Sequence, residues 1–300
     1  MNFRIGVDGG GTKTECILLD EHGAVAARHL APGCNPSLVG ADRARAILVE
    51  AIEGLVADFP SPVIERVLLC MAGSQSFWEE TAAALAGYGH VSAASDALPV
   101  LELATRGGPG LALHAGTGSF IIARAHDESV HYAGGLGWRF GDPGSGHDLG
   151  RRGIARALLE LQGWAPRTDL ADELARHTGL ADYAANSRFF YRDADPNGTI
   201  AAFATRLIDL AEQDCRPARE VIADSLFGFA GPVNAVLQQF FARATTASPV
   251  PCGVSGALLN RPPCWSALRA LAEAQSWPVE LRPVTDRPIE GIRLLVQKMA

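Results

Sequence analysis

A run of small, charged and hydroxyl-bearing residues near the start of the chain could bind a phosphate group. Residues 8–14 read Asp-Gly-Gly-Gly-Thr-Lys-Thr and join two apolar runs, which predicts a strand, a tight turn and a second strand. Three successive glycines carry no Cβ atom, so an anion can reach the backbone N–H groups. Thr12 and Thr14 add hydroxyl donors, and Asp8 adds a carboxylate that could hold a hydrated magnesium ion.

A plain hairpin is the competing interpretation of this stretch, because Gly-Gly pairs commonly connect two strands without binding any ligand. Three glycines exceed what a hairpin turn needs, and an acid at the end of a strand suggests a bound partner. The segment is neither a Walker loop nor the GxGxxG turn that opens a helix in dinucleotide-binding proteins. The pattern favours phosphate binding, with Lys13 either steering the phosphate or simply solvated.

Asp96 is the residue that we expect to take up a proton. It follows a short apolar strand at residues 91–94 and precedes a helix, a position that can direct a carboxylate into a cleft. Phosphoryl transfer needs mainly positioning and charge stabilisation, with one carboxylate to accept the proton of the substrate hydroxyl. The alternative role is structural, since a Ser-Asp pair before a helix commonly provides its N-cap.

The strand–turn–strand pattern occurs a second time in the middle of the chain. Apolar residues 111–115 lead into Gly116-Thr117-Gly118-Ser119, and a further strand follows. The two stretches share their pattern rather than their residues, which predicts two related domains facing each other. The second turn would supply an opposing half for a phosphate that the first turn holds.

Length, charge and cysteine content limit the class of protein. The 300 residues are enough for two domains with sizeable cores, and a net charge of -7 argues against nucleic acid and anionic membranes as partners. Six scattered cysteines without a CxxC pair indicate reduced thiols. We expect no signal peptide and no apolar stretch near the ~18 residues of a membrane span. These features predict a cytoplasmic protein.

Strands and helices alternate along the chain, which indicates an α/β fold. Besides the two hairpins, we expect strands at residues 24–30, 63–71, 91–94, 130–133, 250–254 and 279–281. Helices are expected at residues 42–56, 77–85, 145–162, 170–177, 199–213, 218–243 (bent near Gly231-Pro232), 265–275 and 289–298, with another beginning near Pro99. Residues 32–37 contain two prolines and a glycine and are expected to have no regular structure.

Three motifs, in order along the chain, resemble those of a known superfamily. Residues 8–14, residues 115–119 (Ala-Gly-Thr-Gly-Ser) and residues 252–256 (Cys-Gly-Val-Ser-Gly) are similar to the phosphate-1, phosphate-2 and adenosine motifs of the actin, sugar-kinase and heat-shock ATPase superfamily. More narrowly, nearly the whole chain resembles the N-acetylglucosamine kinase branch, the BadF/BadG-type ATPase family. This resemblance implies two ribonuclease H-like (actin-like ATPase) domains with an interdomain active-site cleft. The domains would be residues 1–110 and residues 111–300, the second with a helical insertion and a last helix able to pack back on the first.

The resemblance also implies roles for individual residues. Asp8 would hold Mg²⁺ through water, and Asp96 would be the catalytic base. ATP would be bound by Gly9, Gly10, Gly11, Thr12, Lys13, Gly116, Thr117, Gly118, Ser119, Gly253 and Gly256. The sugar would contact Asn35, Asp96, Gly135, Leu136, Gly137 and Asp142.

The glycine-rich block at residues 134–146 departs from the family pattern GGWGxxxGDEGS. Leu136 stands where the tryptophan is expected, Trp138 lies two positions later, and Pro143 replaces the glutamate. These departures concern the sugar pocket more than the reaction. In the alternative interpretation, the block is a plain connector in which Asp142 caps the following helix.

On this resemblance we expect an ATP-dependent kinase of an amino sugar, best matched by N-acetylglucosamine phosphorylated at its primary 6-hydroxyl. ATP and Mg²⁺ would be the cofactors, and the assembly would be a homodimer. Glucosamine or another hexose is the alternative substrate. An energy-transducing ATPase that activates a partner enzyme is the alternative of a different class. It would need cysteines for an iron–sulfur cluster shared between two subunits, and Cys34 and Cys252 are left open for that role.

Overall fold

The computed structural model describes residues 2–116 and 118–299, so Thr117, one of the predicted phosphate-binding residues, lies outside the described residues. The chain divides into two compact units. The first unit consists of Met1–Gly107 together with Asp286–Ala300, and the second consists of Gly108–Thr285. The sequence-based boundary at residue 110 lies close to this division, and the last helix belongs to the first unit.

The first unit is built on a five-stranded sheet whose order is β3-β2-β1-β4-β5. Its strands are β1 Asn2–Gly9, β2 Lys13–Leu19, β3 Val25–Pro32, β4 Val63–Met71 and β5 His90–Ser95. β1, β2 and β3 pair antiparallel, whereas β1, β4 and β5 pair parallel. The carboxyl ends of β1, β4 and β5 therefore meet at one edge of the sheet.

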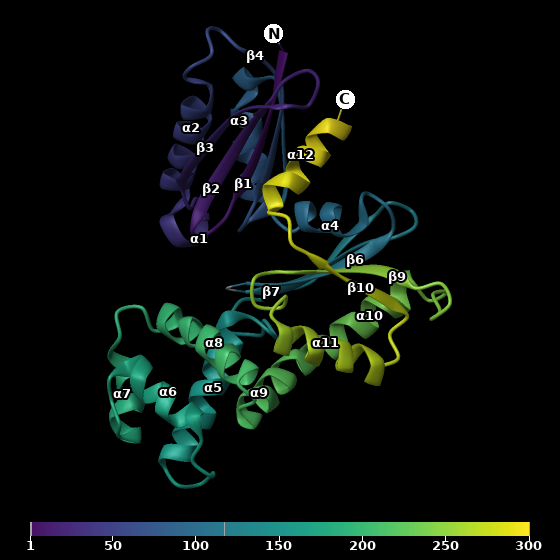
Figure 1. Ribbon diagram of the computed structural model, residues 1–300. Helices are drawn as coiled ribbons and strands as arrows, with labels where there is room; N and C mark the ends of the chain where they lie inside the picture. The colour runs from purple at the N-terminus through teal and green to yellow at the C-terminus, as the bar shows by residue number, and fades with distance from the viewer. Residues whose placement is uncertain (1, 117, 300) are drawn as a thin grey trace. The chain divides into compact units, whose positions relative to one another are not determined.

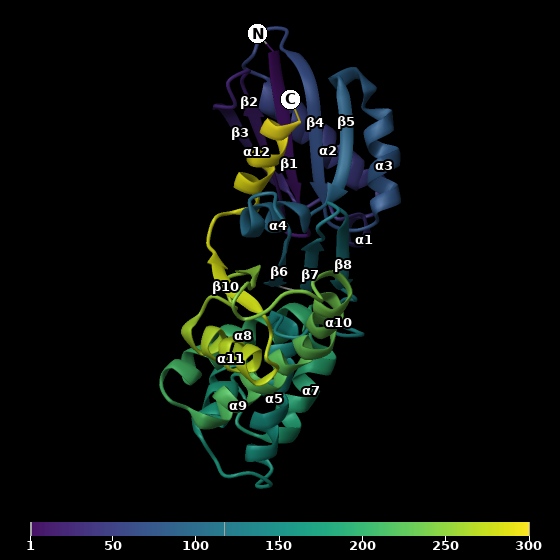
Figure 2. The ribbon, with the colours of Figure 1, turned by 90° about the vertical axis from the view of Figure 1, so that its right-hand side faces the viewer.

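Helices cover both faces of this sheet (Figures 1 and 2). They are α1 Pro36–Val39, α2 Ala41–Val56, α3 Gln75–Ala84, η1 Ala86–Tyr88, α4 Leu98–Thr105 and α12 Pro288–Lys298. Val7 and its neighbours at alternate positions of β1 pack with residues of α2 and α3. On the opposite face, Cys70 of β4 packs with Ile289 and Ile292 of α12. The near-continuous burial along β2 and the second half of β4 is what a sheet covered on both faces requires.

The second unit repeats the topology of the first. Its sheet has the order β10-β9-β6-β7-β8, with β6, β7 and β8 antiparallel and β6, β9 and β10 parallel. The strands are β6 Gly110–Ala115, β7 Ser119–Arg124, β8 Val130–Gly134, β9 Val250–Ser255 and β10 Val279–Val284. The prediction of two related α/β domains is confirmed by this shared strand order.

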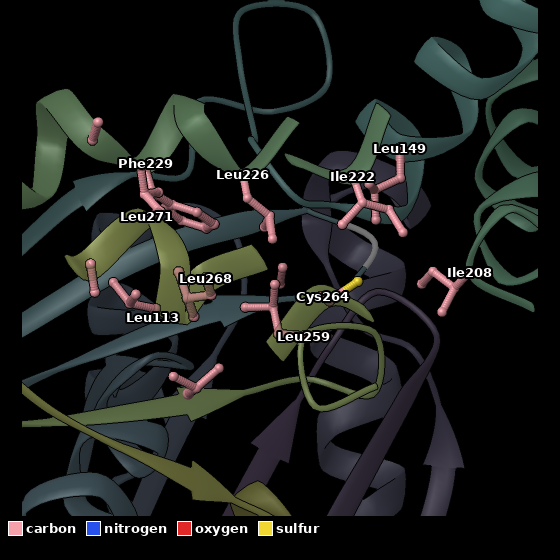
Figure 3. Packing of buried hydrophobic residues seen from close by; sticks show 14 of the residues in the cluster. Leu113, Leu149, Ile208, Ile222, Leu226, Phe229, Leu259, Cys264, Leu268 and Leu271 are labelled. Atoms are coloured by element: carbon pink, nitrogen blue, oxygen red, sulfur yellow. The ribbon is translucent and has the colours of Figure 1, made fainter. Parts of the chain in front are cut away.

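The helices of the second unit surround a large apolar core (Figure 3). They are α5 Gly146–Leu161, α6 Asp169–Thr178, α7 Tyr183–Arg192, α8 Pro196–Glu212, α9 Arg216–Leu226, η2 Phe227–Phe229, α10 Ala230–Phe240 and α11 Pro262–Ala274. Leu113 of β6, Leu149 of α5 and Leu268 of α11 all belong to this core. Most of the inserted helices lie between β8 and β9 in the sequence, as expected.

One helical stretch among the described residues, Arg216–Phe240, is long and apolar enough to cross a membrane when judged by length and composition alone. A helix was expected over most of this stretch, but no stretch of membrane-spanning length was. Val221, Ile222, Leu226 and Phe229 belong to the core of the second unit, so a core helix accounts for this apolar character.

Three details of the predicted secondary structure are wrong. Residues 36–39 form a single helical turn, α1, because Asn35 caps it and Pro36 fits its first position. Helix α7 was not predicted. The long helix expected at residues 218–243 is interrupted by the 3₁₀ turn η2, before rather than at the Gly231-Pro232 pair.

Candidate active site

The first glycine turn connects β1 to β2 and exposes its backbone. The N–H of Gly10 donates to the carbonyl of Lys13 at 2.9 Å, which closes the turn. Gly11, Thr12 and Lys13 are exposed, and Gly10 is half-buried. Gly9 differs from the others, because it is buried at the end of β1, where a Cβ atom would overlap the side chain of Met71. The exposed part of the turn has the form that an anion-binding backbone needs.

The segment after β3 supports this turn from behind. The N–H of Cys34 donates to the carbonyl of Gly10 at 3.1 Å. A Cβ atom on Gly33 would overlap the carbonyl of Gly11, so only glycine allows this approach. The turn and the segment that begins at Gly33 are therefore one packed unit.

Thr14 holds the same segment and does not face a ligand. Its side chain is fully buried, and its hydroxyl donates to the carbonyl of Pro32 at 2.8 Å. The same hydroxyl lies 3.1 Å from the Cys34 sulfur, a second and weaker acceptor for its proton. The sequence interpretation of Thr14 as a phosphate donor is wrong, because its proton is already used; Thr12 remains exposed.

Two carboxylates lie at the edge of the sheet where β1, β4 and β5 end. Asp8 of β1 pairs with Cys70 of β4, which in turn pairs with Ala94 of β5. Asp96 lies two residues after Ala94, just beyond the end of β5. Burial raises the pKa of Asp8 to about 6; Lys13 opposes this rise, and the negative charges of Asp96 and Glu15 add to it. Burial also raises the pKa of Asp96, against hydrogen bonds from Ser95 and from backbone N–H groups. Two acids with perturbed pKa values at one strand edge are typical of a functional site.

Asp96 does not cap α4. The N-cap residue of that helix is Ala97, which makes no side-chain cap hydrogen bond. The hydroxyl of Ser95 accepts from the N–H of Ala97 at 3.2 Å and lies 3.3 Å from Asp96 Oδ1. Asp96 is therefore not the N-cap of α4, although its carboxylate accepts hydrogen bonds from Ser95 and from nearby backbone N–H groups.

Helix α12 fixes the position of α4, the helix that follows Asp96. Gly291 of α12 lies against the backbone of Pro99, where a Cβ atom would overlap its carbonyl oxygen. Lys298 forms an ion pair with Glu102, whose side chain is almost completely buried. The C-terminal segment thus contributes to the placement of the proposed base.

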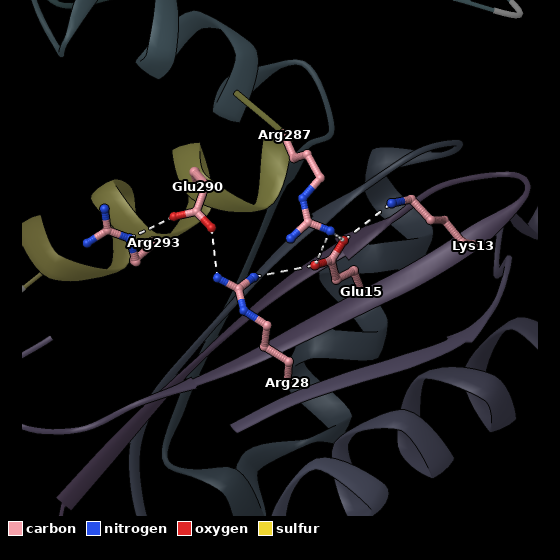
Figure 4. A network of polar contacts seen from close by, with 6 residues as sticks. All are labelled: Lys13, Glu15, Arg28, Arg287, Glu290 and Arg293. Atoms are coloured by element: carbon pink, nitrogen blue, oxygen red, sulfur yellow. Dashed lines mark hydrogen bonds and ion pairs between the residues drawn. The ribbon is translucent and has the colours of Figure 1, made fainter. Parts of the chain in front are cut away.

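Lys13 is part of a network of charges around Glu15 (Figure 4). Glu15 is buried on β2 and forms ion pairs with Lys13 at 3.3 Å, Arg28 at 3.4 Å and Arg287 at 3.1 Å. Arg28 also pairs with Glu290 at 2.8 Å. Three cations around one buried carboxylate leave an excess of positive charge beside the first glycine turn.

Asn35 is held in a fixed orientation. Its Oδ1 accepts from the N–H of Ser37 at 3.0 Å, which caps α1. Gly73, with φ of +102°, lies against the same oxygen, and a Cβ atom there would come within 2.9 Å. These contacts occupy the side-chain carbonyl, so the amide NH₂ is the part of Asn35 that can donate to a ligand.

The second glycine turn connects β6 to β7. The N–H of Gly116 donates to the carbonyl of Gly118 at 2.8 Å, and the N–H of Gly146 donates to the carbonyl of Gly116 at 2.8 Å. Gly146 is the first residue of α5, so the turn is tied to the start of that helix. Gly256, at φ of +106°, lies so close to Ala115 that a Cβ atom would overlap its carbonyl.

Gly253 does not lie at the second glycine turn. It is buried inside β9, paired with Arg282 on one side and Ala112 on the other, three residues before Gly256. Its predicted contact with adenosine stays a prediction. His114, in contrast, lies near the turn; its Nδ1 is 3.2 Å from Ser255 Oγ, and burial lowers its pKa to about 4.

The loop between β8 and α5 combines fixed and exposed residues. The N–H of Gly135 donates to the carbonyl of Ser119 at 3.0 Å, so the loop begins against the second turn. Leu136 and Trp138 are exposed, as is Phe140, which sequence reasoning did not single out. The Trp138 ring lies 5.2 Å from the ring of His147, and the Arg139 guanidinium lies 5.0 Å from Trp138.

Asp142 is buried against the second glycine turn. Its Oδ2 lies against Gly118, so that a Cβ atom added to Gly118 would come within 2.9 Å of this oxygen. Its carboxylate also accepts backbone hydrogen bonds from Gly137 and Ser119. Its Oδ1 is buried and has no hydrogen-bond partner among the described residues. The cap of α5 is Ser145, whose Oγ accepts from the N–H of Asp148 at 3.2 Å, so the alternative of a plain helix cap is wrong.

A magnesium site built from protein ligands alone is absent from the described residues, because no group of three or more His, Cys, Asp or Glu side chains is placed to hold a metal. Magnesium usually keeps several waters and takes one or two carboxylates besides the phosphates of a nucleotide. Asp8 fits that mode, since its carboxylate lies one residue from the end of β1 and is partly buried next to a second acid.

Several supporting residues were missed by sequence reasoning. Gly33, Gly73 and Glu15 position the predicted site residues without themselves lying in a recognisable motif. The signal for Gly33 and Gly73 was present only as isolated glycines beside predicted strand ends. An acid two residues beyond Lys13 is the only sign of Glu15, and its partner Arg287 lies far along the chain.

Comparison with known proteins identifies the family. The BadF/BadG/BcrA/BcrD ATPase family matches residues 5–274. The chain therefore belongs to this family, which implies that it uses ATP. The prediction made from the three motifs is confirmed at this level.

Curated relatives and a solved structure are similar over large parts of the chain. The N-acetyl-D-glucosamine kinase of Dictyostelium discoideum is 29% identical over 189 residues, which are 57% of this chain and 58% of that relative. The chain thus spans less than two thirds of that relative. The N-acetylmuramic acid/N-acetylglucosamine kinase of Clostridium acetobutylicum is 26% identical over 222 residues, 70% of this chain and 71% of the relative.

The fold is also that of a solved protein. A Chromobacterium violaceum protein provisionally named N-acetylglucosamine kinase has a TM-score of 0.73 and 23% identity, covering 98% of this chain and 99% of that one. This likeness, together with the two sheets of matching strand order, confirms the predicted fold class of two actin-like ATPase domains.

Proposed function

We propose that this member of the BadF/BadG/BcrA/BcrD ATPase family phosphorylates an amino sugar with ATP, at the 6-hydroxyl of N-acetylglucosamine. The observation that carries the proposal is the neighbourhood of the first glycine turn. There, an exposed backbone turn suited to phosphate lies beside two acids whose pKa values are raised by burial. The names of the curated relatives support an amino sugar as the acceptor.

Asp96 is proposed to accept the proton of the sugar hydroxyl. The carboxylate lies at the carboxyl end of β5 and is not used as a helix cap. A raised pKa makes it a stronger base than an exposed aspartate once it is ionised. Its hydrogen bond from Ser95 and the packing of α4 on α12 restrict its position, which favours proton transfer in one geometry.

Asp8 is proposed to hold magnesium through water. When bound, the ion would neutralise charge on the phosphate oxygens. The exposed N–H groups of the first turn would bind phosphate oxygens, with positive charge supplied by Lys13 beside them. The second turn offers the Ser119 hydroxyl, which is buried without a hydrogen-bond partner among the described residues.

Asn35 and Asp142 are proposed to contact the sugar, the first as a donor and the second as an acceptor. The Asn35 amide can donate, since its carbonyl oxygen is used in capping α1. Asp142 Oδ1 can accept, since it is buried and has no partner among the described residues. A sugar hydroxyl can both donate and accept, so it can satisfy either group.

The exposed apolar side chains near Asp142 favour an acetylated sugar over glucosamine. Leu136, Trp138 and Phe140 lie on the same loop as Asp142 and are 64%, 47% and 81% exposed. An acetyl methyl group would find apolar surface there, whereas the ammonium group of glucosamine would gain nothing from it. Because Leu136 replaces the family tryptophan, we expect binding weaker than a tryptophan face would give.

The burial of Cys34 and Cys252 argues against the alternative of an energy-transducing ATPase. Cys34 and Cys252 are both essentially inaccessible. Burial raises the pKa of Cys34, and it raises the pKa of Cys252 to about 12. A cluster shared between subunits needs accessible thiolates, so these two cysteines do not suit that role.

The proposal is tested by ADP release in the presence of Mg-ATP and a panel of sugars. N-acetylglucosamine should stimulate release most, glucosamine and glucose less, and sugars lacking a free 6-hydroxyl not at all. Asp96→Asn should lower turnover ~100-fold or more, as loss of a general base usually does. Asp42→Asn, which removes an exposed acid from the same unit, is the matched control and should retain wild-type turnover.

Two results would contradict this reading. If no sugar increases ADP release above the basal rate, the sugar-kinase proposal is wrong. If Asp96→Asn keeps near-wild-type turnover while sugar stimulation persists, the acceptor is right but the base is another group.

A further inference from the structure

Asp142 makes contacts that sugar binding alone would not require. Its carboxylate is buried, with one oxygen against Gly118 in the second glycine turn and backbone hydrogen bonds from Ser119 and Gly137. Ser119 ends the turn and Gly137 lies in the loop that leads to Asp142. A single carboxylate thus fastens the loop to the turn.

The backbone at Asp142 indicates that this arrangement is imposed rather than incidental. Its φ of +94° is rare for a residue with a side chain and is maintained only where surrounding contacts determine it. Those contacts include the N–H of Ser145, which donates to the Asp142 carbonyl at 3.2 Å, and the N–H of Gly144, which donates to Ser225 Oγ at 2.9 Å.

Among the described residues, two further hydrogen bonds tie the turn to its surroundings. The carbonyl of Gly116 accepts from Gly146, and the carbonyl of Ser119 accepts from Gly135. Both of these bonds hold the ends of the turn. Gly118 lies against the Asp142 carboxylate, since an added Cβ atom would come within 2.9 Å of its Oδ2.

We infer that Asp142 is a positioning residue for the second phosphate turn, and that its loss weakens nucleotide binding even when no sugar is present. This inference rests on the proposed function, in which that turn binds phosphate. It adds that one buried carboxylate serves both substrates: Oδ2 orders the turn, and Oδ1 remains open toward the sugar.

A similar connection exists in the first unit. Gly33 lies against the carbonyl of Gly11, and Asn35, two residues later, is the proposed sugar donor. Each unit therefore has its sugar-contacting side chain on a segment that is packed directly on its own glycine turn. The two substrates are expected to affect one another's affinity through these segments.

The test measures binding of Mg-ADP to the full chain by calorimetry, without sugar. Asp142→Asn keeps the shape of the side chain but removes the charge that accepts the backbone hydrogen bonds, and Asp142→Ala removes both. Bonds to a charged group of this kind correspond to about tenfold in affinity or more, so we expect Asp142→Ala to weaken Mg-ADP about tenfold and Asp142→Asn by less. Asp127→Asn, an exposed acid in the same unit, makes the same charge change and should bind Mg-ADP normally.

Hydrogen exchange provides a second measurement that does not depend on catalysis. Peptides covering residues 116–119 should exchange faster in Asp142→Asn than in the wild type, while peptides from α11 should be unchanged. This separates local loosening of the turn from general loss of structure, and it applies even if Asp142→Ala does not fold.

The outcomes distinguish this inference from the kinase proposal. Normal Mg-ADP affinity in Asp142→Asn and Asp142→Ala, with only the KM for sugar raised, would overturn the positioning role and leave the kinase proposal intact. A wild type that binds no Mg-ADP overturns the inference as well. A wild type that binds Mg-ADP but responds to no sugar, with weakened ADP binding in the variants, supports the positioning role and contradicts the sugar assignment.

Discussion

Replacing Asp8 by asparagine should make the folded protein more stable, although Asp8 is proposed to bind magnesium. Burial raises the pKa of Asp8 from 3.8 to about 6, so the ionised form is less favourable in the folded protein than in the unfolded chain. At pH 7 the group is ionised in both states, and the difference corresponds to about 3 kcal/mol of free energy of unfolding. An asparagine of the same shape avoids this loss.

The sign of the pH dependence follows from the raised pKa. Well below pH 3.8, Asp8 is protonated in both states and the penalty is absent. The penalty grows as the pH rises through the interval from 3.8 to about 6 and is complete above it. The gain from Asp8→Asn should therefore fall from about 3 kcal/mol at pH 7 to about half of that at pH 5.

Urea unfolding followed by circular dichroism, without magnesium or nucleotide, measures this gain. Wild type, Asp8→Asn and the exposed-site control Asp42→Asn should be compared at pH 7 and pH 5. We expect a higher urea midpoint only for Asp8→Asn, together with weaker Mg-ADP binding. An Asp8→Asn protein that is no more stable than the wild type at pH 7, or a gain that is the same at both values, would refute the reasoning.

Three further predictions concern other parts of the site. Glu15→Gln should lower the free energy of unfolding, measured by urea, by about 1–3 kcal/mol, since it leaves Lys13, Arg28 and Arg287 without their shared buried carboxylate. Gly256→Ala should weaken Mg-ADP binding or reduce soluble yield, because the new Cβ atom would overlap the backbone beside the second turn. In a pH profile of kcat/KM with the preferred sugar, the apparent pKa of the acidic limb should be higher than that of an ordinary aspartate, because burial raises the pKa of Asp96. An acidic limb at or below pH 4 would contradict this.

The glycine turns could be predicted from the sequence because their chemistry belongs to the backbone. Glycines between two apolar runs, three in the first unit and two in the second, restrict the local structure so strongly that the strand–turn–strand arrangement follows in both units. The same local reasoning gave the wrong role for Thr14. Nothing in its neighbourhood along the chain reveals that Pro32, eighteen residues later, accepts its proton.

The supporting contacts could not be predicted, because they join residues that are distant in sequence. Arg287 reaches Glu15 across 272 positions, and Gly291 meets the backbone of Pro99. A single sequence does not state which charged residue pairs with which. The short helix α1 was missed for a related reason, since a proline-rich stretch indicates a break unless the capping contact of Asn35 is known.

The shared topology of the two units also explains why the proposed acid–base chemistry is confined to one of them. β6 corresponds to β1, so His114 occupies the position of Asp8, one residue before the end of the strand. β10 corresponds to β5, so Thr285 follows the strand where Asp96 does in the first unit. Burial lowers the pKa of His114 to about 4, which leaves its ring neutral near pH 7.

A neutral imidazole and a hydroxyl add no negative charge at these positions. A bound nucleotide already carries several negative charges, and additional carboxylates beside the turn that binds its phosphates would repel it unless further cations were supplied. With acids at these two positions in the first unit only, the base and the magnesium ligand are proposed for that unit, and the second turn has the Asp142 carboxylate against Gly118 but no further acid at the position of His114 or Thr285. This division predicts that His114→Asp would weaken Mg-ADP binding at pH 7 more than His114→Asn does, and equal affinities of the two variants would contradict it.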